Sequence, residues 1–561
     1  RATLIVMAVS VGAMSASAHS SVPVSAGFAD GLAAAGVRQL FGMPGGGPNL
    51  DMIGAAARCG IGFLLAHGET AACVMAGAFG LLTGTTGVTL VTRGPGLTSA
   101  ANGLAQADLD RAPLLLVSDC VPGGQRDRTG HQRLDQLAVS APLTRWSGTL
   151  GHRDPAGCVA AAAALAAGPP AGAVHLDYDP GVPGDLPPAP PGPPPVDDLA
   201  LRHATALAAG ARHPVVILGA GAARAAQPAA QQAAAQQAAA QQAVAQYAAV
   251  RAALAGIPVL TTYQALGCVD ATGPGSAGLF TNAALERPLL ERADLIVGVG
   301  LDGIEPMPGP WTYRAPVLLL SDTEVDGAYY VAPHIVLGPL GRTVPAVLAA
   351  TAPAWPADAG RTHRDARLTE LAAGAREAAL HPVDLARAVA EAAGDAQLSV
   401  DAGAHMLAVM PFWPASRPHQ VLISNGLATM GYALPAAIGA ALARPGERVF
   451  CLVGDGGLGM TLAELETLAR LRLPVTVVVF DDAALSLIEI KQRTGQGDGG
   501  AVRFGPVDFA AVATAMGVPA ATADDLAGVR SALRGPRVGP FLLDARISPA
   551  GYRHILTVSR G

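Results

Sequence analysis

The sequence predicts an α/β fold made of three doubly wound parallel-sheet domains. Short runs of β-branched and other apolar residues alternate with Ala-rich stretches that favour helix. These runs lack polar alternation, which is typical of parallel strands buried on both faces. Two breaks in composition leave blocks at residues 24–185, 199–350 and 375–548. We therefore expect three domains with these bounds.

The expected strands occur in each block. The clearest are residues 114–119, 214–221, 293–300, 448–456 and 473–482. The first break, at residues 186–198, is rich in proline, which lacks an amide donor and favours an extended linker. The second and weaker break lies at residues 352–360.

Composition excludes several classes of function. Apolar residues make up 51% of the 561-residue chain and charged residues 14%, which is typical of a globular protein and not of a disordered one. The formal net charge is −6 and no long basic run occurs, so we expect no nucleic-acid partner. The six cysteines are scattered singly, as in reduced cytoplasmic proteins.

One apolar stretch near the N-terminus has the form of a signal peptide. Residues 3–14 are followed by Ala16-Ser17-Ala18, a pattern seen at cleavage sites. The stretch is too short to span a membrane, and no other segment is predicted to do so. We expect a cytoplasmic protein without membrane contact, with export as the less favoured alternative.

The third block contains a glycine-rich turn with a carboxylate. Gly454-Asp455-Gly456-Gly457 follows a predicted buried strand, where backbone amides can face a diphosphate and Asp455 a hard cation. The next strand ends at Asp481-Asp482, and Asp482 lies 27 positions after Asp455. Consecutive parallel strands end at the same sheet edge, so both carboxylates could share one Mg²⁺. Alternatively, Asp455 caps a helix and the aspartate pair begins a turn.

This spacing resembles the cofactor motif of thiamine-diphosphate (ThDP)-dependent enzymes, and the chain as a whole resembles the acetolactate synthase large catalytic subunit. The likeness extends from about residue 24 to 550. It implies that Asp455, Asp482 and the Ala484 carbonyl bind Mg²⁺. Asp481 departs from the family pattern, which usually has Asn there.

Two further segments of the third block, residues 401–406 and 424–442, resemble other cofactor-binding parts of the family. The likeness implies that Met430 bends the cofactor. By themselves, His405 could be a surface residue and Met430 a core residue. The complete set of implied cofactor contacts is Gly403, Ala404, His405, Met430, Asp455, Gly456, Gly457, Asp482, Ala484 and Leu485.

The first block resembles the family's pyrimidine-binding domain, the second its central domain and the third its diphosphate-binding domain. By this likeness Glu69 is the catalytic glutamate, whose carboxyl group bonds N1′ of the aminopyrimidine and drives the tautomer that deprotonates C2. A lone Glu is otherwise most often a solvated surface residue. Family members place this glutamate in a site between subunits, which implies a homodimer or homotetramer.

The resemblance also implies the reaction. The cofactor attacks a 2-oxo acid such as pyruvate, CO₂ leaves, and the resulting enamine adds to an acceptor carbonyl. The alternatives are a lyase or decarboxylase of the 2-hydroxyacyl-CoA lyase or benzaldehyde lyase type, and a catalytically silent binding or regulatory homologue. Retention of Glu69, Asp455 and Asp482 together argues against the silent homologue.

The substrate contacts implied by the likeness are Gly46, His67, Gln132, Leu487 and Lys491. Lys491 stands where the synthases carry a Trp. The arginine-bearing segment that the synthases use against the acceptor carboxylate is replaced here by residues 301–311. One hypothesis is that Lys491 supplies the missing positive charge. The alternative is a solvated lysine.

The second block contains a partial dinucleotide motif. Residues 219–224, GAGAAR, follow a predicted strand, but they lack the third glycine and an acidic residue about 20 positions further on. A plain strand-to-helix turn is therefore the expected structure. Because the synthases hold FAD in this domain, the sequence leaves FAD binding open. Residues 229–246 repeat Ala and Gln and predict an exposed helix.

Overall fold

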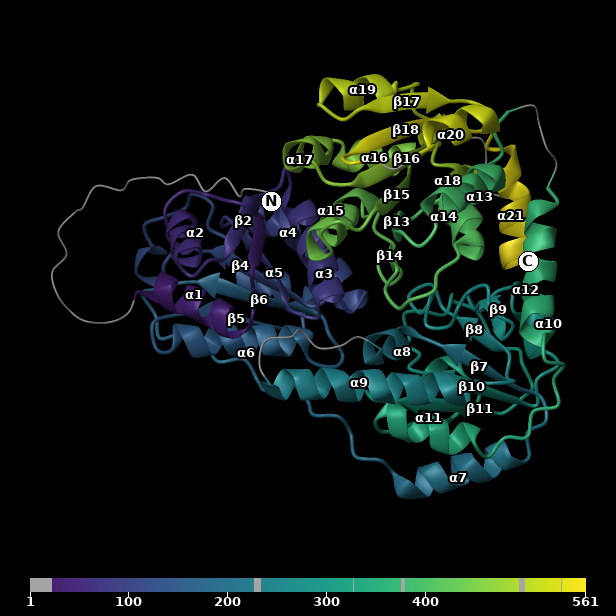
Figure 1. Ribbon diagram of the computed structural model, residues 1–561. Helices are drawn as coiled ribbons and strands as arrows, with labels where there is room; N and C mark the ends of the chain where they lie inside the picture. Colours follow the sequence, from purple (N-terminus) through teal and green to yellow (C-terminus); the bar gives the residue numbers. More distant parts are fainter. Residues whose placement is uncertain (1–22, 227–233, 326, 375–378, 494–499, 536) are drawn as a thin grey trace.

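The computed structural model describes the chain except residues 1–22, 227–233, 326, 375–378, 494–499 and 536. The signal-like stretch therefore lies outside the described residues. The described residues form three six-stranded sheets with helices between the strands (Figure 1). All the strand pairs within these sheets are parallel, which confirms the predicted fold class. None of the described helices is long and apolar enough to cross a membrane.

The first sheet has the strand order β2-β1-β3-β4-β6-β5. Its strands are β1 (Gln39–Met43), β2 (Gly62–Leu65), β3 (Gly87–Val91), β4 (Leu114–Asp119), β5 (Trp146–Leu150) and β6 (Ala173–Tyr178). Its helices are α1 (Val24–Ala34), α2 (Pro48–Arg58), α3 (Glu69–Thr83), α4 (Pro95–Leu109), α5 (Gln136–Ser140) and α6 (Pro155–Ala167), with 3₁₀ turns η1 (Gly123–Gln125) and η2 (Ala141–Leu143). The strand order reverses between β1 and β3.

The second sheet has the order β12-β11-β10-β7-β8-β9. Its strands are β7 (Pro214–Leu218), β8 (Val259–Thr261), β9 (Ser276–Leu279), β10 (Leu295–Val299), β11 (Val317–Ser321) and β12 (His334–Leu337). The accompanying helices are α7 (Asp198–Ala209), α8 (Ala220–Ala225), α9 (Ala234–Ala253), α10 (Arg287–Leu290), α11 (Leu340–Leu348) and α12 (Ala359–Ala372), with η3 (Gly327–Tyr329). Helix α9 confirms that the Ala/Gln repeat is helical from Ala234; its first residues lie outside the described part.

The third sheet has the order β14-β13-β15-β16-β18-β17. Its strands are β13 (Gln397–Val400), β14 (Val421–Ile423), β15 (Val449–Gly454), β16 (Val475–Asp481), β17 (Ala520–Ala523) and β18 (Phe541–Arg546). Its helices are α13 (Pro382–Ala393), α14 (Ala404–Val409), α15 (Ala433–Ala443), α16 (Asp455–Thr461), α17 (Glu464–Leu471), α18 (Ser486–Arg493), α19 (Phe509–Ala515), α20 (Leu526–Ala532) and α21 (Ala550–Arg560), with η4 (Met410–Phe412) and η5 (Gly500–Val502).

Strand β15 shows why the apolar runs lack polar alternation. Cys451 and Val453 belong to one hydrophobic core, whereas Phe450 and Leu452, on the other face, belong to a second core. Every position of such a strand therefore needs an apolar side chain. Each strand predicted from the sequence is present, although the predicted ranges 214–221 and 448–456 extend into the helices that follow the strands.

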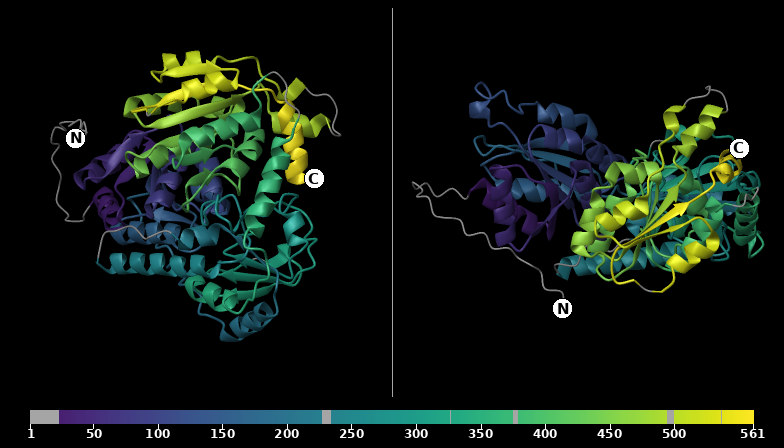
Figure 2. Two further views of the ribbon diagram at one scale, coloured as in Figure 1. Left: turned by 45° about the vertical axis from the view of Figure 1, so that its right-hand side comes forward. Right: turned by 90° about the horizontal axis from the view of Figure 1, so that it is seen from above.

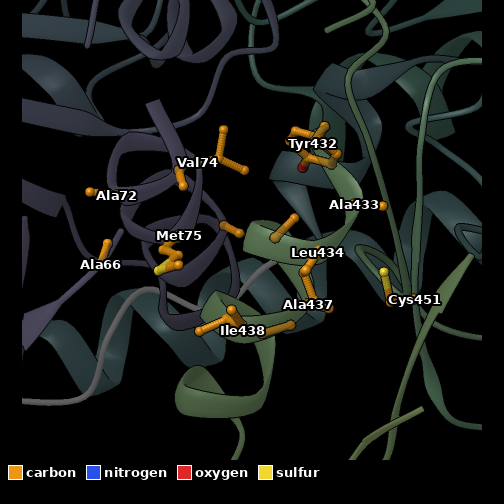
Figure 3. Packing of buried hydrophobic residues seen from close by; sticks show 14 of the residues in the cluster. Ala66, Ala72, Val74, Met75, Tyr432, Ala433, Leu434, Ala437, Ile438 and Cys451 are labelled. Atoms are coloured by element: carbon orange, nitrogen blue, oxygen red, sulfur yellow. The ribbon is translucent and has the colours of Figure 1, made fainter. Parts of the chain in front are cut away.

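The first and third sheets share a core through helices α3 and α15. Figure 3 shows Met75 on the side of α3 that faces Leu434, Ala437 and Ile438 of α15. The approach is close, because a Cβ atom on Gly439 would lie 2.3 Å from the Met75 carbonyl oxygen. The two views of Figure 2 show the first and third units side by side. The contact thus fixes the two units relative to each other.

Candidate active site

A pocket of about 220 Å³ lies at the carboxyl edge of the third sheet. It is where the strand order reverses between β13 and β15, which is the usual ligand position in an open parallel sheet. The loops after β13, β15 and β16, the segment before α15 and the C-terminal helix α21 all contribute residues to its wall.

Every residue predicted to contact the cofactor lines this pocket. The set is Gly403, Ala404, His405, Met430, Asp455, Gly456, Gly457, Asp482, Ala484 and Leu485. These residues come from four segments that are far apart in the sequence. The parallel topology brings their strand ends to one edge, as the motif spacing predicted.

Asp455 is the first residue of α16 and is buried. Its carboxylate accepts hydrogen bonds from the backbone N–H of Gly456 (2.7 Å) and of Ala484 (3.1 Å). Burial raises the pKa of this carboxyl group to about 6, and the charge of Asp481 adds to the effect. Asp455 therefore begins α16 but does not cap it, since the N-cap residue is Gly454, and it also faces the pocket.

Asp482 follows β16 and faces the same pocket. It accepts a hydrogen bond from the Ser486 hydroxyl group. Burial is the main cause that raises its pKa to about 7, and the negative charge of Asp455 contributes. Two buried carboxyl groups with raised pKa values in one pocket are a suitable pair of ligands for a divalent cation, which would favour their ionised forms.

Within the described residues, no group of three or more His, Cys, Asp or Glu side chains could hold a metal ion. Two carboxylates alone leave most positions of a six-coordinate cation unfilled. A cation here would therefore need backbone carbonyl, water or ligand oxygen atoms as well. That requirement fits the predicted carbonyl ligand, Ala484.

His405 is the second residue of α14, and only 4% of it is exposed. Burial lowers the pKa of its imidazole to about 4, so the ring is neutral near pH 7. Its Nε2 atom has no hydrogen-bond partner among the described residues. A buried polar atom without a partner beside a pocket is consistent with a missing polar ligand.

In the turn after β15, two positions have room only for glycine. A Cβ atom on Gly456 would lie 2.8 Å from the Leu485 side chain. A Cβ atom on Gly457 would lie 2.0 Å from a carboxylate oxygen of Asp401. The backbone can therefore lie close to both the pocket and the buried carboxylate only because these positions carry no side chain.

The pocket wall also contains residues that sequence reasoning missed. They are Ala402, Ala428, Gly454, Phe480, Ser486, Ile488 and Tyr552. Ser486 could have been found, since it lies only four residues after Asp482 and its hydroxyl reaches that carboxylate. Tyr552 comes from α21, which carries no motif; only the packing of the C-terminal helix brings it here.

The residues predicted in the first unit lie elsewhere. Glu69 is the partly exposed first residue of α3, at the carboxyl edge of the first sheet, and it does not line the pocket. His67 is exposed, and its Nε2 lies 2.8 Å from a carboxylate oxygen of Glu466. Gly46 and Gln132 are exposed. No described residue in the pocket wall comes from the first unit.

The two remaining substrate candidates lie on helix α18. Leu487 lines the pocket. Lys491, one helical turn further along, is exposed and lies outside the wall. Residues four apart share a helix face, so Lys491 lies on the same side of α18 as Leu487.

Comparisons with known proteins find matches to the first and the third unit and, for whole relatives, to most of the chain. The family described as "Thiamine pyrophosphate enzyme, C-terminal TPP binding domain" matches residues 401–545, and "Thiamine pyrophosphate enzyme, N-terminal TPP binding domain" matches residues 23–139. The catabolic acetolactate synthase of Raoultella terrigena is 29% identical over 544 residues, which cover 92% of this chain and 94% of that protein. An acetolactate synthase of Bacillus subtilis is 28% identical over 92% of each chain. The acetolactate synthase isozyme 1 large subunit of Escherichia coli is 27% identical over 91% of this chain and 92% of its own.

Proposed function

Because the chain belongs to the thiamine-diphosphate-dependent enzymes and is an acetolactate-synthase-like decarboxylating carboligase, we propose that it acts on a pyruvate-like 2-oxo acid. One carbon–carbon bond of the acid breaks to release CO₂. A new bond then joins the remaining acyl fragment to an acceptor carbonyl, giving a ketol. The observation that carries the proposal is the single pocket that gathers all the predicted cofactor contacts.

The pocket residues fit ThDP and Mg²⁺. Asp455, Asp482 and the Ala484 carbonyl would hold the cation, and the amides of Gly456 and Gly457 would face the diphosphate. The raised pKa values of the two carboxyl groups, the glycine cradle and the unpartnered His405 Nε2 support this assignment. Gly403, Ala404, Met430 and Leu485 would form the rest of the cofactor contact. When bound, ThDP supplies the electron sink for the carbon–carbon chemistry.

The pocket also supplies an apolar wall, which would exclude water from the reacting groups once a second copy of the chain covers it. Leu485, Leu487 and Ile488 contribute it. In an apolar setting, a substrate carboxylate is less well solvated than in water, and its loss as neutral CO₂ removes that cost. We assign Leu487 to this substrate-facing wall.

Glu69 would come from a second copy of the chain. It holds or releases a proton at N1′ of the bound pyrimidine, yet it lies outside the pocket of its own chain. Large apolar side chains are exposed near both places: Met43, Leu50 and Leu65 at the edge of the first sheet, and Met460, Ile488 and Phe504 around the pocket. A homodimer, alone or within a homotetramer, would cover these side chains and complete the site.

Four further residues belong to the proposed substrate side. Gly46 and Gln132 would lie with Glu69 at the edge of the first sheet, and His67 is held there by Glu466. Lys491 would attract the carboxylate of an anionic substrate. If so, Lys491→Ala raises KM for 2-oxo acids, Lys491→Arg does not, and the Kd for ThDP stays the same in both. Unchanged steady-state constants for every anionic substrate would refute the role of Lys491.

The central sheet does not fit a flavin diphosphate. Its order reverses between β7 and β10, and the backbone N–H of Ala220 at this point donates to both carboxylate oxygens of Glu305, at 3.0 and 3.1 Å. The N–H of Gly221 donates to the Gly300 carbonyl at 2.8 Å. The chain's own carboxylate and backbone thus occupy the place of a phosphate, and we propose no role for FAD.

We also propose a cytoplasmic location. The six cysteines are free, and none except Cys59 is more than slightly exposed. Reduced cysteines are typical of the cytoplasm.

The proposed function is tested by incubating the protein with ThDP, Mg²⁺ and a panel of 2-oxo acids. CO₂ release is measured, and the ketol is identified by mass spectrometry. We expect CO₂ and a ketol from pyruvate or a close analogue, and neither product without ThDP. Release of CO₂ without any ketol would mean that the protein only decarboxylates the acid. No turnover with any acid would refute the proposal.

A further inference from the structure

We propose that Asp401 is a positioning residue for the cofactor site. Its single buried carboxylate holds three cofactor-binding segments in place relative to one another. The inference rests on the proposed function, since it concerns the same pocket. Asp401 itself does not line the pocket, so it would act only through the segments that do.

The first segment is the one that carries Asp401. The residue follows β13 directly, and its own N–H donates to the Leu452 carbonyl of β15 at 3.0 Å. The next residues along the chain, Ala402 to His405, line the pocket. The position of Asp401 is therefore fixed by the central strands of the sheet, two residues before the predicted cofactor contacts that begin at Gly403.

The second segment is the one that carries Met430. The two carboxylate oxygens of Asp401 accept hydrogen bonds from successive backbone N–H groups, those of Gly431 (2.8 Å) and Tyr432 (3.0 Å). Both bonds are charge-assisted, and neither donor belongs to a regular strand. They hold the chain immediately after Met430, before α15 begins at Ala433.

The third segment is the glycine turn. The carboxylate lies so close to Gly457 that a Cβ atom there would be 2.0 Å from Asp401 Oδ2. The turn that carries Asp455 and Gly456 therefore packs directly on this carboxylate. Asp401 therefore contacts three segments that each carry predicted cofactor contacts.

The environment of Asp401 makes the arrangement sensitive to small changes. The residue has no exposed surface, and burial raises the pKa of its carboxyl group to about 6. An asparagine at this position keeps the shape but turns an N–H group toward one of two backbone N–H donors. That donor loses its acceptor and must move, and the segment with Met430 moves with it.

The experiment compares Asp401→Asn with the wild type by calorimetric titration of ThDP into the metal-loaded but ThDP-free protein. We expect Kd for ThDP to rise at least about tenfold, because two charge-assisted bonds are disturbed. The matched control is Glu286→Gln, which changes a fully buried carboxylate of the central unit that accepts backbone bonds from Ala283 and Thr281. We expect it to lower Tm without changing this Kd.

A double-mutant cycle tests the contact with the glycine turn. Gly457→Ala should weaken ThDP binding in the wild type, where the new methyl group meets the Asp401 carboxylate, but add little in the Asp401→Ala background, where that carboxylate is gone. If Asp401→Ala does not fold, Asp401→Ser, whose shorter side chain also leaves room for the methyl group, takes its place in the cycle, with full additivity as the result that refutes the contact.

Two outcomes would overturn the inference while leaving the proposed function intact. One is a wild-type Kd in Asp401→Asn. The other is an equal rise in Kd for Glu286→Gln, which would show that any buried carboxylate has the same effect through general loss of stability. A wild-type protein that binds no ThDP at all would instead refute the proposed function, and the inference with it.

Discussion

Among single residues, Glu69 has the most specific proposed role, because proton movement at the pyrimidine ring requires a carboxyl group. Glu69→Gln keeps the side-chain shape and removes the titratable proton. We expect kcat to fall about 10²- to 10⁴-fold, which is the usual contribution of a general acid–base group. The Kd for ThDP should stay close to that of the wild type. CO₂ release and a ThDP titration measure the two quantities, and an unchanged kcat would remove Glu69 from the mechanism.

The buried carboxyl group of Glu305 should make the free energy of unfolding depend on pH. The residue is buried, and burial raises the pKa of its carboxyl group to about 7. The folded protein therefore binds this proton more tightly than the unfolded chain does. As a result, this group stabilises the wild type more as the pH falls from about 7 toward the pKa of Glu305 in the unfolded chain, and less as the pH rises. The change in the free energy of unfolding is on the order of 1–3 kcal/mol.

Glu305→Gln removes this titration. The Tm difference between wild type and variant should then favour the wild type more at about pH 5 than at about pH 8. Differential scanning calorimetry measures it, with Glu391→Gln at an exposed carboxylate as the control. A Tm difference that is the same at both pH values would show that Glu305 does not titrate in this way.

At the same scale, the residues that line the pocket were predictable where a motif fixes both residue type and spacing. Asp455 and Asp482 are examples: each follows a buried strand, and parallel topology brings both to one edge. Asp401 and Tyr552 were not predictable. Asp401 acts through backbone groups that any sequence supplies, and Tyr552 depends on how α21 packs.

Among the secondary-structure elements, helices α3 and α15 pack so closely that Gly439 has no room for a side chain. Gly439→Ala would place a methyl group 2.3 Å from the Met75 carbonyl oxygen, so one helix must move. We expect a loss of about 1–3 kcal/mol, as in other overpacked cores, seen as a lower Tm.

The control for this substitution is Gly54→Ala in α2. A Cβ atom there would meet only the Arg58 guanidinium, at 3.7 Å. Alanine is the better helix former, so this variant should keep or raise Tm, by up to about 1 kcal/mol of stability. Equal Tm changes in the two variants would show that the helix contact is not the cause.

The strands were more predictable than the helix contacts. A run of apolar residues without alternation identifies a strand buried on both faces, and β4, β7, β10, β15 and β16 are all present as expected. The sequence does not indicate which helix faces which. Apolar residues surround α15 on nearly every side, so its pattern does not select α3 as a neighbour.

At the scale of the whole molecule, the chain carries two halves of a proposed site that do not meet within one copy. The pocket of the third sheet contains the predicted cofactor contacts, while Glu69 lies at the edge of the first sheet. The sequence identified both halves through the family likeness. Their separation within one chain depends on how the units pack, which no local pattern encodes.

The most direct test of this account mixes two inactive variants. Glu69→Gln lacks the proposed proton-transfer group, and Asp455→Asn lacks a proposed metal ligand. Each is purified, checked for folding by circular dichroism and for size by light scattering, and found inactive alone. The two are then mixed under conditions that let subunits exchange, with ThDP, Mg²⁺ and pyruvate present, and ketol formation is followed.

A dimer of one copy of each variant would contain one site with an intact Glu69 and an intact Asp455, contributed by different subunits. The account therefore predicts that ketol formation returns on mixing and is absent in either variant alone. Mixed dimers that form, as shown by mass spectrometry, but make no ketol would contradict an active site shared between two copies of this chain.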